Sequence, residues 1–70
     1  MNDAVDILDT KQAARFLGIP PRTLESWRYR GQAPQFIRYN KSQVRYRIAD
    51  LEAFQRSKIV TPADEDIAAA

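Results

Sequence analysis

The stretch that decides the fold is residues 8–34, LDTKQAARFLGIPPRTLESWRYRGQAP. It opens with a short amphipathic segment: Ala14 and Leu17 fall on one side of a helix predicted from Lys11 to Leu17. Thr10 is placed to cap this helix through its hydroxyl group. Gly18 is expected to end it, because glycine adopts the left-handed conformation in which helices often stop.

A second helix is predicted from Pro21 to about Arg30. Pro21 suits the first turn, where a missing backbone N–H costs nothing, and Gly31 is placed to end the helix. Leu24 and Trp27 are three residues apart and are expected to face the core. At 100° per residue, the opposite face carries Arg22, Glu25, Ser26 and Tyr29.

Beyond Pro34 the periodicity changes from helical to alternating. Residues 36–39 favour a strand, and residues 44–48 alternate apolar with basic side chains. The four residues between them, Asn-Lys-Ser-Gln, are typical of a turn, so the two strands are predicted to form a hairpin. A third helix is expected to begin near Ala49, with acidic residues at its positive end.

These elements predict a small α+β fold: two helices, a two-stranded β-hairpin and a third short helix. The apolar spacing predicts a core made of Ala14, Leu17, Leu24, Trp27, Tyr46, Leu51 and Phe54.

Charge divides the 70 residues into three parts. Residues 10–58 hold all eleven basic residues and three acidic ones, a formal charge of +8, whereas residues 1–9 and 59–70 are acidic. We interpret them as an acidic arm, a basic folded domain, and a tail that is disordered or a short helix. A basic domain between acidic ends is typical of a polyanion binder, although arginine can also simply keep a small domain soluble.

Composition argues against several classes of protein. The chain has no histidine and no cysteine, which removes the commonest general base, the commonest metal ligands and any disulfide. We therefore expect that the protein is not an enzyme and that it binds no cofactor or metal ion. No apolar run approaches a membrane span and the N-terminal residues are not those of a secretory signal, so a cytoplasmic location is expected.

Two helices joined by a tight turn and followed by a basic hairpin suit double-stranded DNA, because an α-helix fits the major groove. On the outward face of the second helix, Arg22 can pair with guanine and Ser26 can donate or accept. Tyr29 either reaches a phosphate or thymine methyl group, or packs over the hairpin. Glu25 either accepts from cytosine or holds Arg22 in an i,i+3 ion pair; we favour the ion pair.

The hairpin and the first helix add positive charge. Lys41 at the hairpin tip, flanked by Arg38, Arg45 and Arg47, can follow the phosphate backbone or enter a minor groove. Arg45 and Arg47 could instead simply keep the outer face of the hairpin in contact with water. Lys11, at the start of the first helix, is placed to meet a phosphate.

Residues 8–34, followed by FIRYNKSQVRYRIADLEAF at 36–54, resemble the MerR-type winged helix-turn-helix family, and within it excisionases and AlpA-like phage regulators. The resemblance implies that the second helix enters the major groove and that the hairpin is a wing on the neighbouring minor groove. We call the second helix the reading helix, because the resemblance implies that it contacts base edges. By position, the resemblance adds Thr23 to this helix and Ser42 to the wing, and it places Arg28 and Arg30 near phosphates. The candidate DNA-binding residues are thus Lys11, Arg22, Thr23, Glu25, Ser26, Tyr29, Arg30, Arg38, Lys41, Ser42, Arg45 and Arg47.

The resemblance favours a recombination directionality factor, a protein that assembles on tandem DNA sites and helps an integrase excise a mobile element. A transcription regulator of integrase or transfer genes is the alternative. A third hypothesis is a protein-interaction module in which Phe16 and the acidic tail dock a partner. The long C-terminal coiled coil of MerR regulators has no counterpart in the sequence, so no small-molecule effector is expected.

Overall fold

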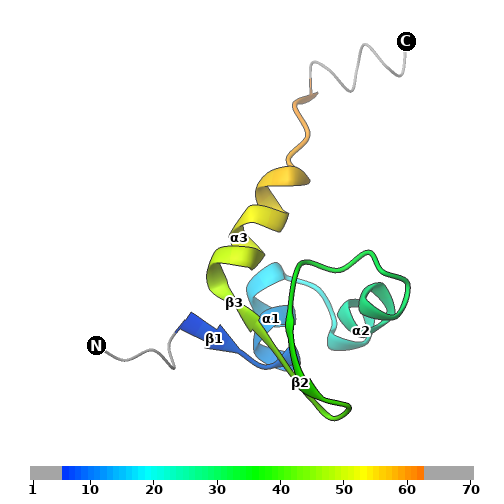
Figure 1. The fold of residues 1–70 in the computed structure, drawn as a ribbon. Helices are drawn as coiled ribbons and strands as arrows, with labels where there is room; N and C mark the ends of the chain where they lie inside the picture. The colour runs from blue at the N-terminus through cyan, green and yellow to red at the C-terminus, as the bar shows by residue number, and fades with distance from the viewer. Residues whose placement is uncertain (1–5, 63–70) are drawn as a thin grey trace.

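The computed structural model describes residues 6–62 and shows the expected small α+β fold (Figure 1). Its elements, in chain order, are β1 (Ile7–Leu8), α1 (Thr10–Leu17), α2 (Pro21–Tyr29), β2 (Ile37–Asn40), β3 (Gln43–Arg47) and α3 (Ile48–Ser57). No helix within residues 6–62 is long and apolar enough to cross a membrane. The prediction for the tail falls mostly on residues 63–70, which lie outside the described part.

Helix α1 is capped by Asp9, and the prediction that Thr10 caps it was wrong. The Asp9 carboxylate accepts from the backbone N–H of Gln12 at 2.8 Å, and the Gln12 side chain accepts from the backbone N–H of Asp9 at 3.0 Å. This reciprocal pair is a capping box, and it satisfies two N–H groups that the helix itself leaves unpaired. Thr10 becomes the first helical residue, which frees its hydroxyl group for a contact with α2.

The turn between α1 and α2 follows the predicted glycine. Gly18 adopts a φ of 75°, and the next N–H, from Ile19, reaches back to the carbonyl oxygen of Ala14 at 3.0 Å. Pro20 then accepts backbone hydrogen bonds from Thr23 and Leu24, which start α2. Gly31 has a φ of 72° just beyond the end of α2, as expected. The two helices are therefore joined by a tight connection fixed at both ends.

The sheet has three strands in the order β1-β3-β2, and both pairs are antiparallel. The hairpin β2–β3 was predicted, and its strands differ from the expected bounds by one residue at each end. Strand β1 was not predicted: Ile7 pairs with Arg47, and Leu8 pairs with Tyr46. Residues 7–9, assigned to the acidic arm from the sequence, therefore belong to the folded domain.

The hairpin closes through a two-residue turn, Lys41–Ser42. The side chain of Asn40 holds this turn, because its carbonyl oxygen accepts from the backbone N–H of Ser42 at 2.9 Å and from its hydroxyl at 3.1 Å. The register shifts between Arg38 and Asn40, so Tyr39 forms a bulge in β2 and remains 62% exposed. A bulge increases local twist, and it sits close to the hairpin tip here.

The core lies between the sheet and the helices. Its buried apolar residues are Ala13, Ala14, Leu24, Val44, Tyr46 and Leu51. Leu17, Trp27 and Phe54, predicted as core, are only half-buried. Trp27 and Phe54 contact each other at the rim, with ring centroids 5.8 Å apart, and so join α2 to α3. The core fully encloses Tyr46, Leu24 and Leu51, whereas Leu17, Trp27 and Phe54 lie at its margin.

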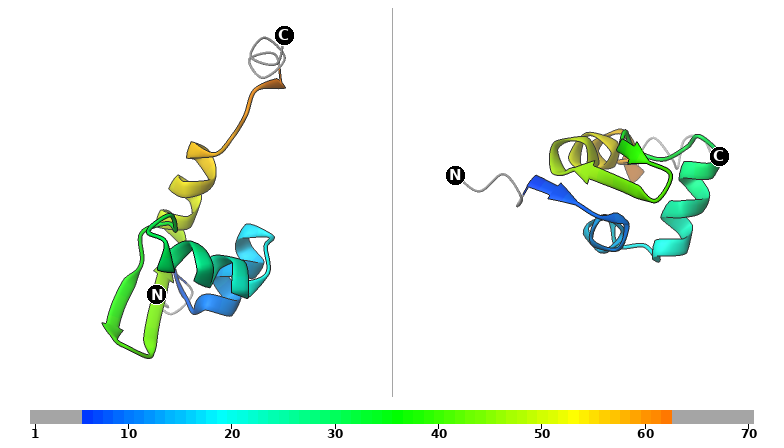
Figure 2. Two further views of the ribbon diagram at one scale, coloured as in Figure 1. Left: turned by 90° about the vertical axis from the view of Figure 1, so that its right-hand side faces the viewer. Right: turned by 60° about the horizontal axis from the view of Figure 1, so that its bottom comes forward.

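The views in Figures 1 and 2 show how these elements are arranged. Helix α1 packs beside β3 and α2, while the hairpin extends from the body beyond both helices. Helix α3 continues directly from β3 and carries the chain away on the side opposite the hairpin tip. The outer face of α2 and the hairpin thereby form one end of the molecule.

Candidate nucleic-acid interface

The outward face of α2 is exposed, as its helical spacing predicted. Arg22, Glu25 and Ser26 are all exposed, whereas Leu24 is fully buried against α1 and the sheet. Tyr29 is 95% exposed, so it does not pack over the hairpin. Thr23, the remaining residue assigned to the reading helix, is half-buried.

Two adjoining hollows separate α2 from the hairpin. One lies between the outer face of α2 and Arg38 of β2, and the other lies between the start of α1, α2 and the hairpin tip. Because both are lined by Glu25 and Arg28, we treat them as one surface, the basic groove. The predicted DNA-binding residues that line it are Lys11, Glu25, Ser26, Tyr29, Arg38, Lys41, Ser42 and Arg45.

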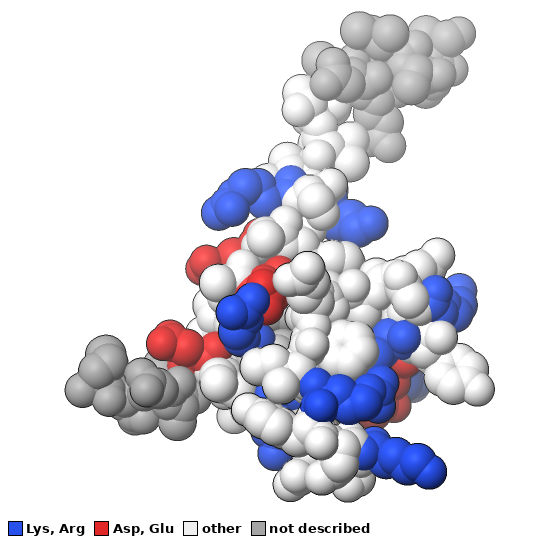
Figure 3. Space-filling model, viewed as in Figure 1, with Lys and Arg blue, Asp and Glu red and all other residues white. Residues whose placement is uncertain are grey.

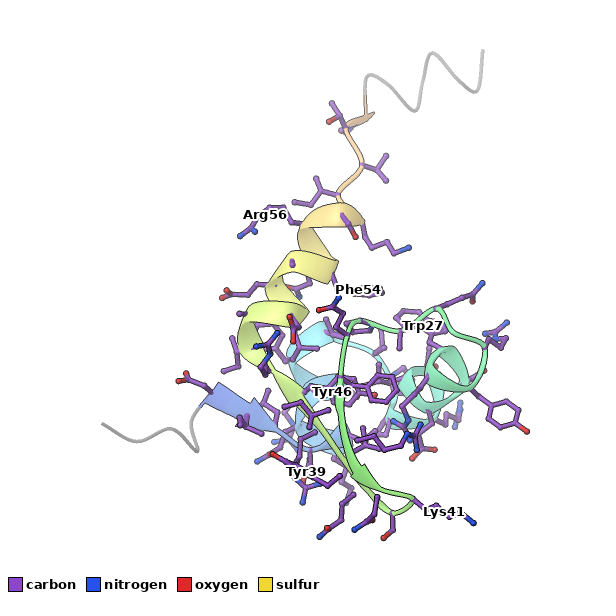
Figure 4. The ribbon with its side chains drawn as sticks, in the orientation of Figure 1. Trp27, Tyr39, Lys41, Tyr46, Phe54 and Arg56 are labelled. Atoms are coloured by element: carbon purple, nitrogen blue, oxygen red, sulfur yellow. The ribbon has the colours of Figure 1, made fainter. Side chains whose placement is uncertain are left out.

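Positive charge dominates this surface. In Figure 3, Lys and Arg side chains gather over the hairpin and along α2, whereas the acidic side chains in this view lie mostly towards β1 and α3. Lys41 projects from the hairpin end into solvent (Figure 4). Arg45 is half-buried and donates to the carbonyl oxygen of Val44 at 2.8 Å, so its guanidinium group is held near the strand edge.

Four predicted DNA-binding residues lie outside the groove: the half-buried Thr23, and Arg22, Arg30 and Arg47. Arg22 and Arg30 are exposed on α2 and at its C-terminal end but do not line either hollow. Arg47 lies at the far end of β3, where it forms a two-pronged ion pair with Asp50 at 2.7 Å and 3.0 Å. This hydrogen bond and the carboxylate's charge raise the pKa of Arg47 above its ordinary value. The pair connects β3 to the first turn of α3.

Arg28 has a role that the sequence reasoning missed. Expected near phosphates, it is half-buried, and its Nη1 donates to the hydroxyl groups of Tyr46 at 2.9 Å and Thr10 at 3.4 Å. Its guanidinium carbon lies 5.9 Å from the centroid of the Phe36 ring, and that of Arg38 lies 5.3 Å from the same ring. Arg28 therefore joins α2 to α1 and to the sheet, and it also lines both hollows of the basic groove. Its expected position near phosphates stays a prediction.

A signal for this contact was present in the sequence. A tyrosine on the apolar face of a strand needs a hydrogen-bond partner for its hydroxyl group once it is buried. Tyr46 is fully buried, and its ring contacts Phe36 with centroids 5.8 Å apart. Spacing alone, however, does not tell which of eleven basic residues supplies that partner.

Glu25 is not paired with Arg22. The single ion pair within residues 6–62 joins Arg47 and Asp50, so the favoured interpretation of Glu25 was wrong. Its side chain instead lines both hollows of the basic groove. There it places one negative charge among the cations of α1 and the hairpin, where it can accept a hydrogen bond from a base edge.

The arrangement of elements defines the class of protein. Two helices joined by a glycine-containing turn, a hairpin beside the second helix, and a basic surface between them make a winged helix-turn-helix domain. Within residues 6–62, no group of three or more His, Cys, Asp or Glu residues is arranged to hold a metal ion.

The chain belongs to the helix-turn-helix domain family. The model of that family, described as "Helix-turn-helix domain", matches residues 7–58, which spans every helix and strand given above. No curated protein matches the chain. Helix-turn-helix domains bind DNA, so the basic groove is the surface to consider for that contact.

The Arg28–Tyr46 contact predicts a change in stability. Replacing Tyr46 with phenylalanine keeps the buried ring but leaves Nη1 of Arg28 without its nearer acceptor, and we expect unfolding free energy to fall by about 1 kcal/mol. Urea denaturation measures the change. Tyr39→Phe, at an exposed position, is the matched control and should shift the free energy by less than about 0.5 kcal/mol. Equal shifts for the two variants would contradict the assigned contact.

Proposed function

We propose that this domain places α2 in the major groove of double-stranded DNA and the hairpin on the adjacent minor groove. The observation that carries the proposal is the basic groove, which is bounded on one side by the exposed face of α2 and on the other by the hairpin. An α-helix fits the major groove, and a narrow basic loop suits phosphates and the minor groove. The DNA backbones would then run along the groove between the two elements.

Individual side chains divide into two groups by what they can contact. On α2, Arg22 can donate a bidentate pair to guanine, Ser26 can contact either kind of base, and Glu25 can accept from cytosine. Lys11, Lys41 and Arg45 come from two other elements and surround the second hollow, where they suit phosphates. The first group would supply sequence preference, and the second group would supply most of the affinity.

The role we propose is that of an excisionase, a recombination directionality factor that assembles on tandem sites and promotes integrase-mediated excision. The resemblance of residues 8–34 and 36–54 to excisionases supports it. The protein would act by binding and shaping DNA rather than by catalysis, since its sequence lacks histidine and cysteine. It would work at the nucleoid, with an integrase as its protein partner. The resemblance to AlpA-like regulators supports a second candidate, transcriptional control of integrase or transfer genes.

The salt dependence of binding tests the proposed contacts. Lys41→Ala and Arg45→Ala should each reduce the steepness of log K against log salt by about 0.9, because each removes one phosphate contact. Fluorescence anisotropy on a short duplex, over a salt range of about 50–200 mM, measures this slope.

Arg56→Ala is the matched control, because it removes the same charge from α3, which points away from the hairpin tip. It should leave the slope unchanged. If Arg56→Ala and Lys41→Ala reduce the slope equally, the affinity comes from overall charge and not from the basic groove.

Footprinting distinguishes the candidate roles. An excisionase should protect repeated sites on attachment-site DNA and should raise the yield of integrase-catalysed excision in a reaction with purified proteins. Protection at a promoter without protection at the attachment site would reject excision in favour of transcription control. If an Arg22→Glu/Arg45→Glu variant keeps its cellular phenotype, both DNA-binding roles fall and the protein-interaction hypothesis stands.

A further inference from the structure

The segment after α3 exposes an unusual pair of apolar residues. Ile59 is 73% exposed and Val60 is 58% exposed, although both are large β-branched side chains. Within residues 6–62, the N–H groups of Val60 and Thr61 donate to no backbone carbonyl. The N–H of Ile59 donates to the carbonyl oxygen of Arg56 at 3.4 Å, so the donors left for a partner strand are those of Val60 and Thr61. They lie on a run of three β-branched residues, which favours pairing with a strand.

The sheet offers a free edge of matching character at β1. Strand β1 is the outer strand beside β3, so among residues 6–62 one side of its backbone has no partner strand. Ile7, paired with Arg47, is half-buried rather than covered. A free edge with an apolar residue is a template for an added strand.

Charge complementarity connects these two surfaces. Asp6 and Asp9 flank β1 on either side, while Arg56 and Lys58 lie just before residues 59–61. The Asp9 carboxylate also caps α1, where it accepts from the backbone N–H of Gln12. An added strand would thus bring two cations to an edge bordered by two anions, which favours this pairing over that of either surface with itself.

The two surfaces belong to different copies, because the fold separates them within one chain. Helix α3 begins at Ile48, immediately after Arg47, the residue that pairs with Ile7. Its ten residues span about 15 Å and carry residues 59–61 away from the sheet (Figure 1). The segment therefore points away from its own β1.

We propose that residues 59–61 of one copy add as a strand to the free edge of β1 in a second copy. This contact joins two different surfaces, so an assembly of any length retains a free β1 edge at one end and a free segment 59–61 at the other, and assembly continues head to tail. The contact would serve to link copies on tandem DNA sites, and this purpose rests on the proposed function. So small an interface is weak in solution, and DNA strengthens it by holding copies close together.

Complementation between two variants tests this contact without DNA. Val60→Pro removes the N–H group that an added strand would donate, at a position outside the helices and strands of residues 6–62. Asp6→Arg places a cation at the β1 edge. Sedimentation equilibrium of the full chain, up to about 1 mM, should show that the wild type and the control Val60→Ile associate. Each of the first two variants should associate about tenfold more weakly or not at all.

The mixture of the two variants gives the decisive result. Val60→Pro keeps a native β1 edge and Asp6→Arg keeps a native segment, so an equimolar mixture should form dimers and nothing longer. Association of Val60→Pro at the wild-type level, or a wild type that stays monomeric throughout, overturns the proposal. Loss in both variants without recovery in the mixture also overturns it, because that result indicates contact between like surfaces.

Binding to a duplex just long enough for one copy separates this proposal from the proposed function. Val60→Pro should bind that duplex as tightly as the wild type does. A wild type that self-associates as described but binds no duplex would reject the proposed function and leave the contact between copies in place.

Discussion

The hydrogen bond from Arg28 to the buried hydroxyl group of Tyr46 is the interaction on which the arrangement of this domain depends. It forms where α1, α2 and β3 meet, and the same guanidinium nitrogen reaches Thr10. Helix α2 otherwise packs mainly on α1, so this contact ties it directly to the sheet and hence to the hairpin. Breaking it would leave a buried phenol and a half-buried cation without their best partners.

Fixed geometry matters for the proposed function, because α2 and the hairpin would have to match a rigid ligand. The major and minor grooves of a duplex alternate at a set spacing, so a helix and a hairpin that contact adjacent grooves must themselves keep a set separation. Phe36 reinforces that separation, since it lies against Tyr46 and beneath the guanidinium groups of Arg28 and Arg38. Ala13 and Ala14 are fully buried, and their small side chains allow α1 to approach the sheet and α2 closely.

Much of this fold could be predicted from the sequence because its signals are local. Gly18 and Gly31 end their helices at positive φ, and the alternating pattern from Val44 gives the hairpin. Strand β1 could not be predicted, because two residues are too short to show a periodicity. Asp9 and Gln12 do have the spacing of a capping box, but Thr10 was an equally acceptable cap by residue type.

The site was less predictable than the fold, since its charged residues differ only in what lies near them in space. The exposed face of α2 follows from helical spacing, and the structure places it as expected. Arg28 and Arg47 look like any other basic residue along the chain, yet one is bound to Tyr46 and the other to Asp50. Only the three-dimensional fold separates these two structural cations from exposed ones such as Lys41.

The central claim, that α2 and the hairpin contact adjacent grooves of one duplex, can be tested by cleavage from tethered probes. The chain contains no cysteine, so a single cysteine introduced at Ser26 or at Ser42 can carry an iron chelate that cuts nearby DNA. On a duplex selected for tight binding, the account predicts major-groove cuts from position 26 and minor-groove cuts from position 42, about half a helical turn (~5 base pairs) away. Cuts from both positions in the same groove, or no cuts from position 42, would contradict it.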